Sequence, residues 1–177
     1  MPRQRTKKQD EQLMKRVLSL AALIVAMMCA PLAASERGPV TNLPMPRFVS
    51  LKASEGNVRR GPSLSHRIDW VFKHRNMPLQ VVAEHGHWRR VVDRDGAGGW
   101  VHYTLLSGTR FGLVEEDMTP VYKTADTNSM VVAHAELGAV TRLGKCDDYW
   151  CRITASGAKG WVPREKLWGL MPGETRE

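Results

Sequence analysis

The sequence predicts an all-β fold of two small β-barrels in tandem, preceded by an N-terminal signal segment. Three observations support this prediction: an internal repeat of about 60 residues, short strand-forming runs separated by turn signals, and a basic and then apolar stretch at the N-terminus. The chain has 177 residues, and its repeats cover most of the sequence that follows this stretch.

The repeat is clearest in two aligned segments, residues 88–106 and 150–167. Both read Trp-x-Arg-(Val/Ile), then a glycine-rich turn, then Gly-Trp-Val with a Leu six residues after that Trp. The alignment continues upstream, where Val58 lies 30 residues before the first Trp and Val121 lies 29 residues before the second. Such self-similarity predicts two copies of one structural unit.

Each copy has the pattern of short strands rather than helices. The runs at 79–84 and 139–143 are rich in strand-forming residues and partly alternate between apolar and polar. Asp95-Gly96 and Ser156-Gly157 are hairpin turn signals. We interpret residues 129–136 as a strand with a flanking loop. Because a domain of about 60 residues buries little apolar surface, the two copies are expected to pack together across the short junction at 107–111.

The N-terminus has the order of a secretory signal. Residues 1–16 carry six Lys and Arg, residues 17–30 form an apolar run, and Pro31 and small residues follow. This predicts export to the periplasm or the extracellular space, with cleavage after Ala34. The alternative is an uncleaved membrane anchor formed by residues 17–34, since the apolar run approaches the length that spans a bilayer.

The charge of the chain does not favour nucleic acid as a partner. The whole chain has a net charge of +8, but residues 1–34 contribute six basic and two acidic residues. The remainder holds 20 Lys and Arg against 16 Asp and Glu, a net charge of +4. A nucleic-acid-binding domain typically has a stronger and clustered positive charge. A mildly basic surface is still compatible with anionic envelope polymers.

The repeated motifs resemble those of bacterial Src-homology-3-like (SH3-like) domains. Asn57-Val-Arg-Arg-Gly-Pro-Ser is similar to the opening of such domains, and the Trp88 and Trp100 motifs are similar to their central and closing strands. The resemblance implies five-stranded, partly open barrels that bind peptides or cell-wall material in the envelope. The expected organisation is a signal peptide at 1–34, a linker at 35–46, barrels at 47–108 and 109–169, and a tail at 170–177.

Strand alternation indicates which side chains are available for binding. If Val91 and Ile153 fill the barrel cores, the Trp three residues before each should face outward, beside an Arg. An outward Trp either forms a platform for a ligand or covers a loop or the module junction. Trp70, Trp100 and Trp161 are expected to pack. In the resemblance, Pro163 matches the groove proline of SH3 domains. The candidate ligand-binding residues are Trp88, Arg90, His102, Tyr103, Trp150, Arg152 and Pro163.

The cysteine and histidine residues are more consistent with structural roles than with catalysis or metal binding. Cys146 and Cys151 flank four residues, so a hairpin would set them opposite each other as a disulfide. His85, His87 and His102 could cluster as metal ligands, but solvated loop histidines are the simpler interpretation. No nucleophile motif such as Gly-x-Ser-x-Gly occurs, and no cofactor is expected.

The function expected from these features is non-enzymatic binding in the envelope. The partner would be peptidoglycan, another peptide or an envelope protein, with membrane contact only through an uncleaved signal segment. The alternative is a structural, assembly or stress-sensing scaffold without a ligand groove, and a cell-wall hydrolase is a weaker candidate. These classes differ in where the outward Trp residues lie.

Overall fold

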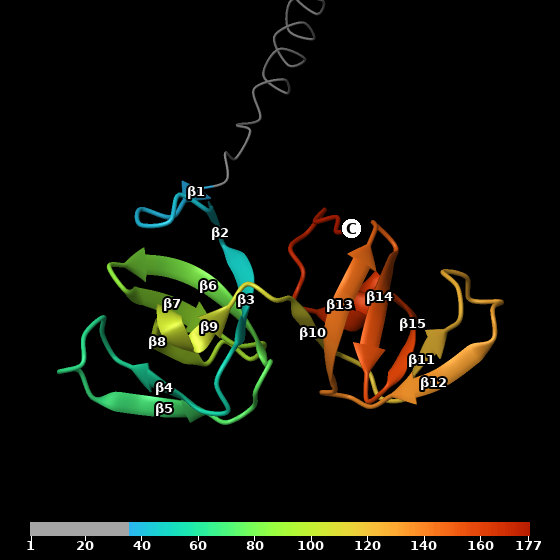
Figure 1. The fold of residues 1–177 in the computed structure, drawn as a ribbon, viewed down its shortest axis with the longest axis horizontal. Coiled ribbons are helices and arrows are strands. Elements are labelled where there is room, and N and C mark those ends of the chain that lie inside the picture. The colour runs from blue at the N-terminus through green and yellow to red at the C-terminus, as the bar shows by residue number, and fades with distance from the viewer. Residues whose placement is uncertain (1–35) are drawn as a thin grey trace, which may run out of the picture. The chain divides into compact units, whose positions relative to one another are not determined.

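A computed structural model describes residues 36–177 of the chain. It is an all-β structure with two seven-stranded antiparallel sheets, one per repeat, and a separate two-stranded hairpin (Figure 1). The all-β fold with two tandem barrels is therefore confirmed. The predicted signal segment, at 1–34, lies outside the described residues. Within those residues, no helix is long and apolar enough to cross a membrane.

The first module is one curled sheet whose strand order is β5-β4-β8-β7-β6-β3-β9. A short 3-10 turn at Tyr103–Leu105 precedes its last strand. Its strands are β3 (Arg47–Leu51), β4 (Gly56–Arg59), β5 (Ile68–Phe72), β6 (Pro78–His85), β7 (Trp88–Val92), β8 (Gly98–His102) and β9 (Leu106–Ser107).

The second module repeats this topology in the order β12-β11-β15-β14-β13-β10-β16. The equivalent 3-10 turn is Arg164–Lys166. Its strands are β10 (Phe111–Val114), β11 (Thr119–Tyr122), β12 (Val131–Ala135), β13 (Val140–Cys146), β14 (Trp150–Ala155), β15 (Ala158–Pro163) and β16 (Leu167–Trp168). The strand predicted within 129–136 is thus present as β12.

Strand alternation places the predicted apolar residues in two separate cores. Val91 is fully buried in the first module, and Ile153 is 2% exposed in the second. Each packs with other valines and leucines of its own module. The predicted two-residue turn at Ser156-Gly157 joins β14 to β15, and both residues have positive φ, as a type I′ hairpin turn requires. The chain therefore follows the alternation that its sequence shows.

Side-chain contacts join the two modules, which lie within one compact unit of the chain. The ring of Phe48 meets the ring of Trp168 edge-on, with 4.9 Å between centroids. The guanidinium of Arg110 lies 5.6 Å from the centroid of the same Phe48 ring. The hydroxyl of Ser50 donates to the carbonyl of Thr109. These contacts agree with the expectation that the copies pack across their short junction.

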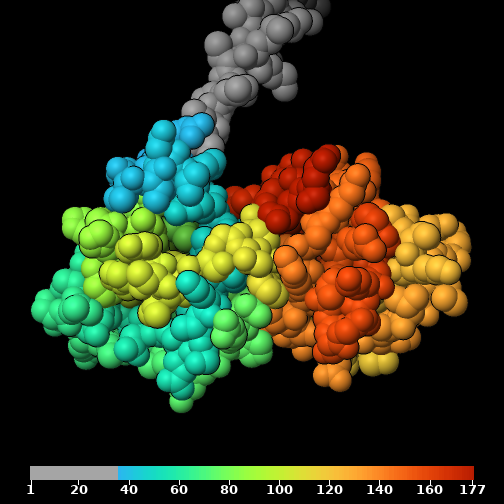
Figure 2. Space-filling model, viewed as in Figure 1, coloured from blue at the N-terminus to red at the C-terminus, as the bar shows by residue number. Residues whose placement is uncertain are grey.

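The stretch 35–46, predicted as a linker, is instead a folded hairpin as far as it is described. Strands β1 (Glu36–Arg37) and β2 (Pro44–Met45) pair with each other, and Figure 2 shows this segment (blue) lying against the first module. The composition of this stretch, with its Pro, Gly and Asn residues, is common to linkers and tight turns. Its anchor lies far along the chain.

That anchor is the carboxylate of Glu84, whose side chain is fully buried. The backbone N–H groups of Val40 and Thr41 donate to Oε2 at 3.1 and 2.9 Å, and the Thr41 hydroxyl donates to Oε1 at 2.7 Å. Arg47 donates to Oε1 at 2.7 Å, and Nε of Arg89 lies 3.4 Å from the same atom. Since a buried carboxylate is costly without such partners, this Glu84 cluster ties the hairpin to the barrel.

The Glu84 cluster should make the fold sensitive to acid. Burial would raise the pKa of Glu84, but hydrogen bonds from Thr41, Arg47 and Val40 outweigh it and lower the pKa from 4.5 to about 2. Because the folded-state pKa is depressed, this stabilisation is present above about pH 4.5 and is lost as the pH falls towards about 2. Urea unfolding at a series of pH values should show this loss, and Glu84→Gln should show a smaller one. Equal acid losses in the two proteins would contradict the prediction.

Candidate functional site

The second module exposes an aromatic surface around Trp150. The indole of Trp150 is half-buried and meets the ring of Tyr122 edge-on, with 5.6 Å between centroids. Pro163 lies directly opposite Trp150 on the neighbouring strand. Arg152 follows on the same face and is exposed. An edge-on aromatic pair beside a proline and a cation forms a surface suited to an extended chain. We call Tyr122, Trp150, Arg152 and Pro163 the β14 groove.

The hairpin that presents Trp150 is closed by a disulfide. Cys146 and Cys151 are bonded and occupy opposed positions on β13 and β14, with Cα atoms 4.1 Å apart. This confirms the predicted disulfide. The carboxylate of Asp147 accepts hydrogen bonds from the backbone N–H groups of Tyr149 and Trp150 at 2.9 and 2.7 Å. These bonds lower the pKa of Asp147 below its ordinary value. Both the disulfide and the hydrogen bonds of Asp147 therefore fix the tip of the hairpin.

The C-terminal tail lies against the same hairpin (Figure 2). Arg176 exchanges two backbone hydrogen bonds with Cys146, each 2.9 Å long. The guanidinium of Arg164 donates to the carbonyls of Asp147, Met171 and Glu174. Residues 170–177, expected as a tail, are thus built into the second module next to the β14 groove.

The equivalent surface of the first module is different. Trp88 is only 9% exposed, and the ring of His102 covers it edge-on at 5.3 Å between centroids. His87 and Tyr103 stack around His102, with centroids 5.9 and 5.1 Å from it. Tyr103 is 47% exposed and Arg90 is also exposed. The accessible aromatic groups next to Trp88 are therefore Tyr103 and the two histidines.

One substitution between the repeats accounts for part of this difference. Arg59 pairs with Trp100 in the first module, and Tyr122 pairs with Trp161 in the second, so Arg59 occupies the place of Tyr122. Arg59 donates to the carbonyls of two loop residues, Leu64 and His66. Because Arg59 bonds to its own loop and is not aromatic, this position of the first module offers no aromatic ring to a ligand. The predicted residues thus form two unequal sites.

Trp70, which was expected to pack, is instead 52% exposed. It lies on β5, an edge strand of its sheet, and neighbouring Leu64 and Ile68 are 75% and 44% exposed. An aromatic strand pattern indicates a strand but does not show whether it lies at the sheet edge, where one face has no covering layer. The charged Asp69 within the same run was the available signal for an exposed strand.

The histidines do not form a metal centre in the part of the chain that the structure describes. No group of three or more His, Cys, Asp or Glu residues between 36 and 177 is arranged to hold a metal ion. His87 and His102 contact each other as rings, and His102 exchanges a hydrogen bond with the Thr104 hydroxyl at 2.8 Å. These interactions organise the aromatic surface of the first module.

Comparison with known proteins places the repeats in a family. No curated protein sequence matches the chain. Among solved structures, NlpC2 and NlpC1 from Trichomonas vaginalis are similar, each at 12% identity and a TM-score of 0.33. The matches cover 71% and 76% of this chain, which spans about half (49%) of each of those chains. The family described as "Bacterial SH3 domain" matches residues 52–108 and 115–169, which are the two modules. The chain therefore belongs to the bacterial SH3 domain family and carries two such domains in tandem.

Proposed function

We propose that this protein is an exported, non-enzymatic binding protein of the bacterial envelope that holds an extended peptide or peptidoglycan stem in the β14 groove. Bacterial SH3 domains generally bind peptidoglycan or proteins. The observation that carries the proposal is the half-buried Trp150, which is stacked edge-on against Tyr122 and opposed by Pro163. The disulfide and the Asp147 hydrogen bonds hold this indole before any ligand arrives, which lowers the entropic cost of binding.

The groove of the second module is favoured over that of the first. Trp88 is covered by His102, so a ligand would have to displace that ring or bind to Tyr103 and the histidines instead. By contrast, the indole of Trp150 is only half-buried and remains accessible. Large aromatic groups supply much of the binding energy of such sites, so the second module is the main ligand-binding unit in this proposal.

Replacing Trp150 with alanine should weaken binding to purified peptidoglycan sacculi at least tenfold, because a central aromatic group is removed. Co-sedimentation of the purified protein with sacculi measures this. Tyr103→Ala, which removes an exposed aromatic group from the first module, is the matched control and should bind like the wild type. Trp88→Ala is less suitable because Trp88 is buried and its loss would destabilise the module.

The outcomes separate the alternatives. Equal sedimentation of wild type and Trp150→Ala would exclude the β14 groove, and loss of binding by Tyr103→Ala alone would move the site to the first module. No sedimentation of the wild type would exclude peptidoglycan. Thermal unfolding of each variant distinguishes loss of a contact from loss of the fold.

A scaffold role is the second candidate, and one observation favours it. Leu64, Ile68 and Trp70 are exposed apolar residues on and beside the edge strand β5. Several large apolar side chains exposed on one edge strand and its loop favour a protein contact there. If sacculi do not bind, Trp70→Ala becomes the variant with which to test association with an envelope protein.

A further inference from the structure

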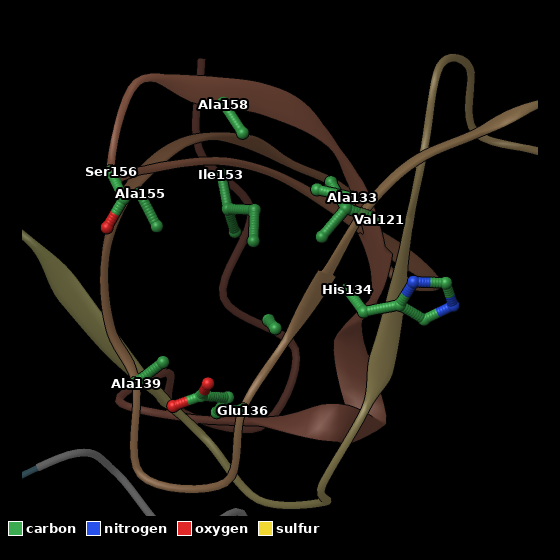
Figure 3. Close-up of a pocket in the computed structure, with 10 residues that line it drawn as sticks. Val121, Ala133, His134, Glu136, Ala139, Ile153, Ala155, Ser156 and Ala158 are labelled. Carbon is green, nitrogen blue, oxygen red and sulfur yellow. The ribbon is translucent and has the colours of Figure 1, made fainter.

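The second barrel contains a hollow at one end that is separate from the β14 groove. Its volume is about 390 Å³, far more than the roughly 10–15 Å³ that a single water needs. Figure 3 shows small apolar side chains facing into it from β11, β12, β14 and β15. No residue of the β14 groove lines it. Its apolar lining consists of Val121, Ala133, Ala135, Ala139, Ile153, Ala155 and Ala158.

The hollow exists because the repeats differ in side-chain size at this end. Ala135 pairs with the residue two positions before the core residue Val121, and Phe72 pairs with the residue two positions before the core residue Val58. Ala135 is therefore the equivalent of Phe72 in the second module. Phe72 is 2% exposed and fills the core of the first module. Ala135 lacks the phenyl ring of Phe72, and this leaves a space that the paired strands around it do not close.

A second difference in side-chain size, between Met77 of the first module and Ala139 of the second, enlarges the same space. Ala139 and Met77 each follow a residue with positive φ, and each accepts a hydrogen bond through its carbonyl at the start of its module, from Val114 and Leu51 respectively. Met77 packs against the core of the first module, whereas Ala139 lines the hollow. Two large side chains of the first barrel are therefore replaced by methyl groups in the second.

The opening of the hollow carries one acidic group. Glu136 lines it and is exposed, and no ion pair within residues 36–177 involves Glu136. Figure 3 shows the carboxylate of Glu136 beside Ala139, while the ring of His134 points away from the hollow. The negative charge of Glu136 would repel an anionic ligand and attract a cationic one. The wall of the hollow thus consists of apolar side chains together with polar atoms, including those of Ser156, and its rim carries a negative charge.

We propose that this hollow binds a short alkyl chain that ends in a positively charged amine, of the kind a lysine side chain presents. The methyl-lined interior removes the alkyl stem from water, and Glu136 pairs with the ammonium at the opening. Small barrels commonly take ligands at their mouths through an apolar wall and few polar groups. This site is independent of the β14 groove, so it does not rest on the function proposed above.

Titration of the full-length protein with 1-hexylamine, followed by NMR of its alanine methyl groups, tests the proposal. Shifts should be confined to the alanines of the hollow, at 133, 135, 139, 155 and 158. The neutral 1-hexanol should bind about threefold more weakly, the effect expected of one exposed ion pair. Glu136→Gln should remove this preference, whereas Glu165→Gln, which changes an exposed acid outside the hollow, should keep it.

Ala139→Met, which introduces the residue of the first barrel, should abolish the shifts caused by both ligands. Methyl signals of the second module outside the hollow, such as those of Val114 and Leu143, report whether this variant is folded. If it is not, Glu136→Gln still tests the recognition of the amine. Absence of shifts in the wild type, or unchanged binding to folded Ala139→Met, would overturn the site. Equal affinity for hexylamine and hexanol would overturn the cationic ligand.

Discussion

Replacing Glu84 with glutamine should lower the free energy of unfolding by about 3 kcal/mol, the cost of breaking a buried ion pair. The amide keeps the shape of the side chain but removes the charge that pairs with Arg47 and Arg89. Both arginine side chains are largely buried, at 17% and 9% exposure. They would be left with uncompensated charge, and the amide could not accept at both of its ends. Urea denaturation followed by tryptophan fluorescence measures the change.

The control for this variant is Glu115→Gln. Glu115 forms an ion pair with Arg94 at 2.9 Å, but both side chains are substantially exposed. Exposed pairs contribute at most about 1 kcal/mol, so this variant should unfold nearly like the wild type. If the two variants lose equal stability, the Glu84 cluster does not anchor the N-terminal hairpin in the way described.

The tandem fold could be predicted because its signals repeat within the sequence. The Gly-Trp-Val motifs, the hairpin turn at Ser156-Gly157 and the alternation around Ile153 are local, and each agrees with the others. Local features of this kind determine strand order when the connections between strands are short. The disulfide was predictable for the same reason, since Cys146 and Cys151 lie on either side of one tight turn.

The N-terminal hairpin could not be predicted because its stability comes from distant residues. Thr41 and Glu84 are 43 positions apart, and nothing in the sequence near either one indicates their contact. A Glu at the end of a strand is usually solvated. Its burial here depends on Arg47 and Arg89 reaching the same carboxylate from β3 and β7.

The candidate site was predicted in outline but not in its asymmetry. Trp88 and Trp150 occupy equivalent strand positions, so alternation alone assigns them the same environment. Their burial differs because the residue opposite is His102 in one module and Pro163 in the other, and because Tyr122 is replaced by Arg59. Those neighbours lie on other strands, and their packing is decided by the tertiary structure.

The second large effect is expected from the disulfide of the second module. Replacing both Cys146 and Cys151 with alanine should lower the free energy of unfolding by about 2 kcal/mol, as expected for a short closed loop. Alanine is chosen because both positions are buried, and a serine hydroxyl there would add a separate cost. Reduction of the wild type should produce a similar loss, and the alanine variant should not respond to reductant.

The same variant should loosen the tip that presents Trp150 and the tail bonded beside it. Amide hydrogen exchange of Tyr149, Trp150 and Arg176 should be at least tenfold faster, because their hydrogen bonds depend on the position of the hairpin. Amides of the first module serve as the internal control and should exchange as in the wild type. If exchange at the tip is unchanged, Asp147 and the tail alone hold Trp150 in place. Faster exchange together with weaker binding to sacculi would instead link the disulfide to the preorganisation of the β14 groove.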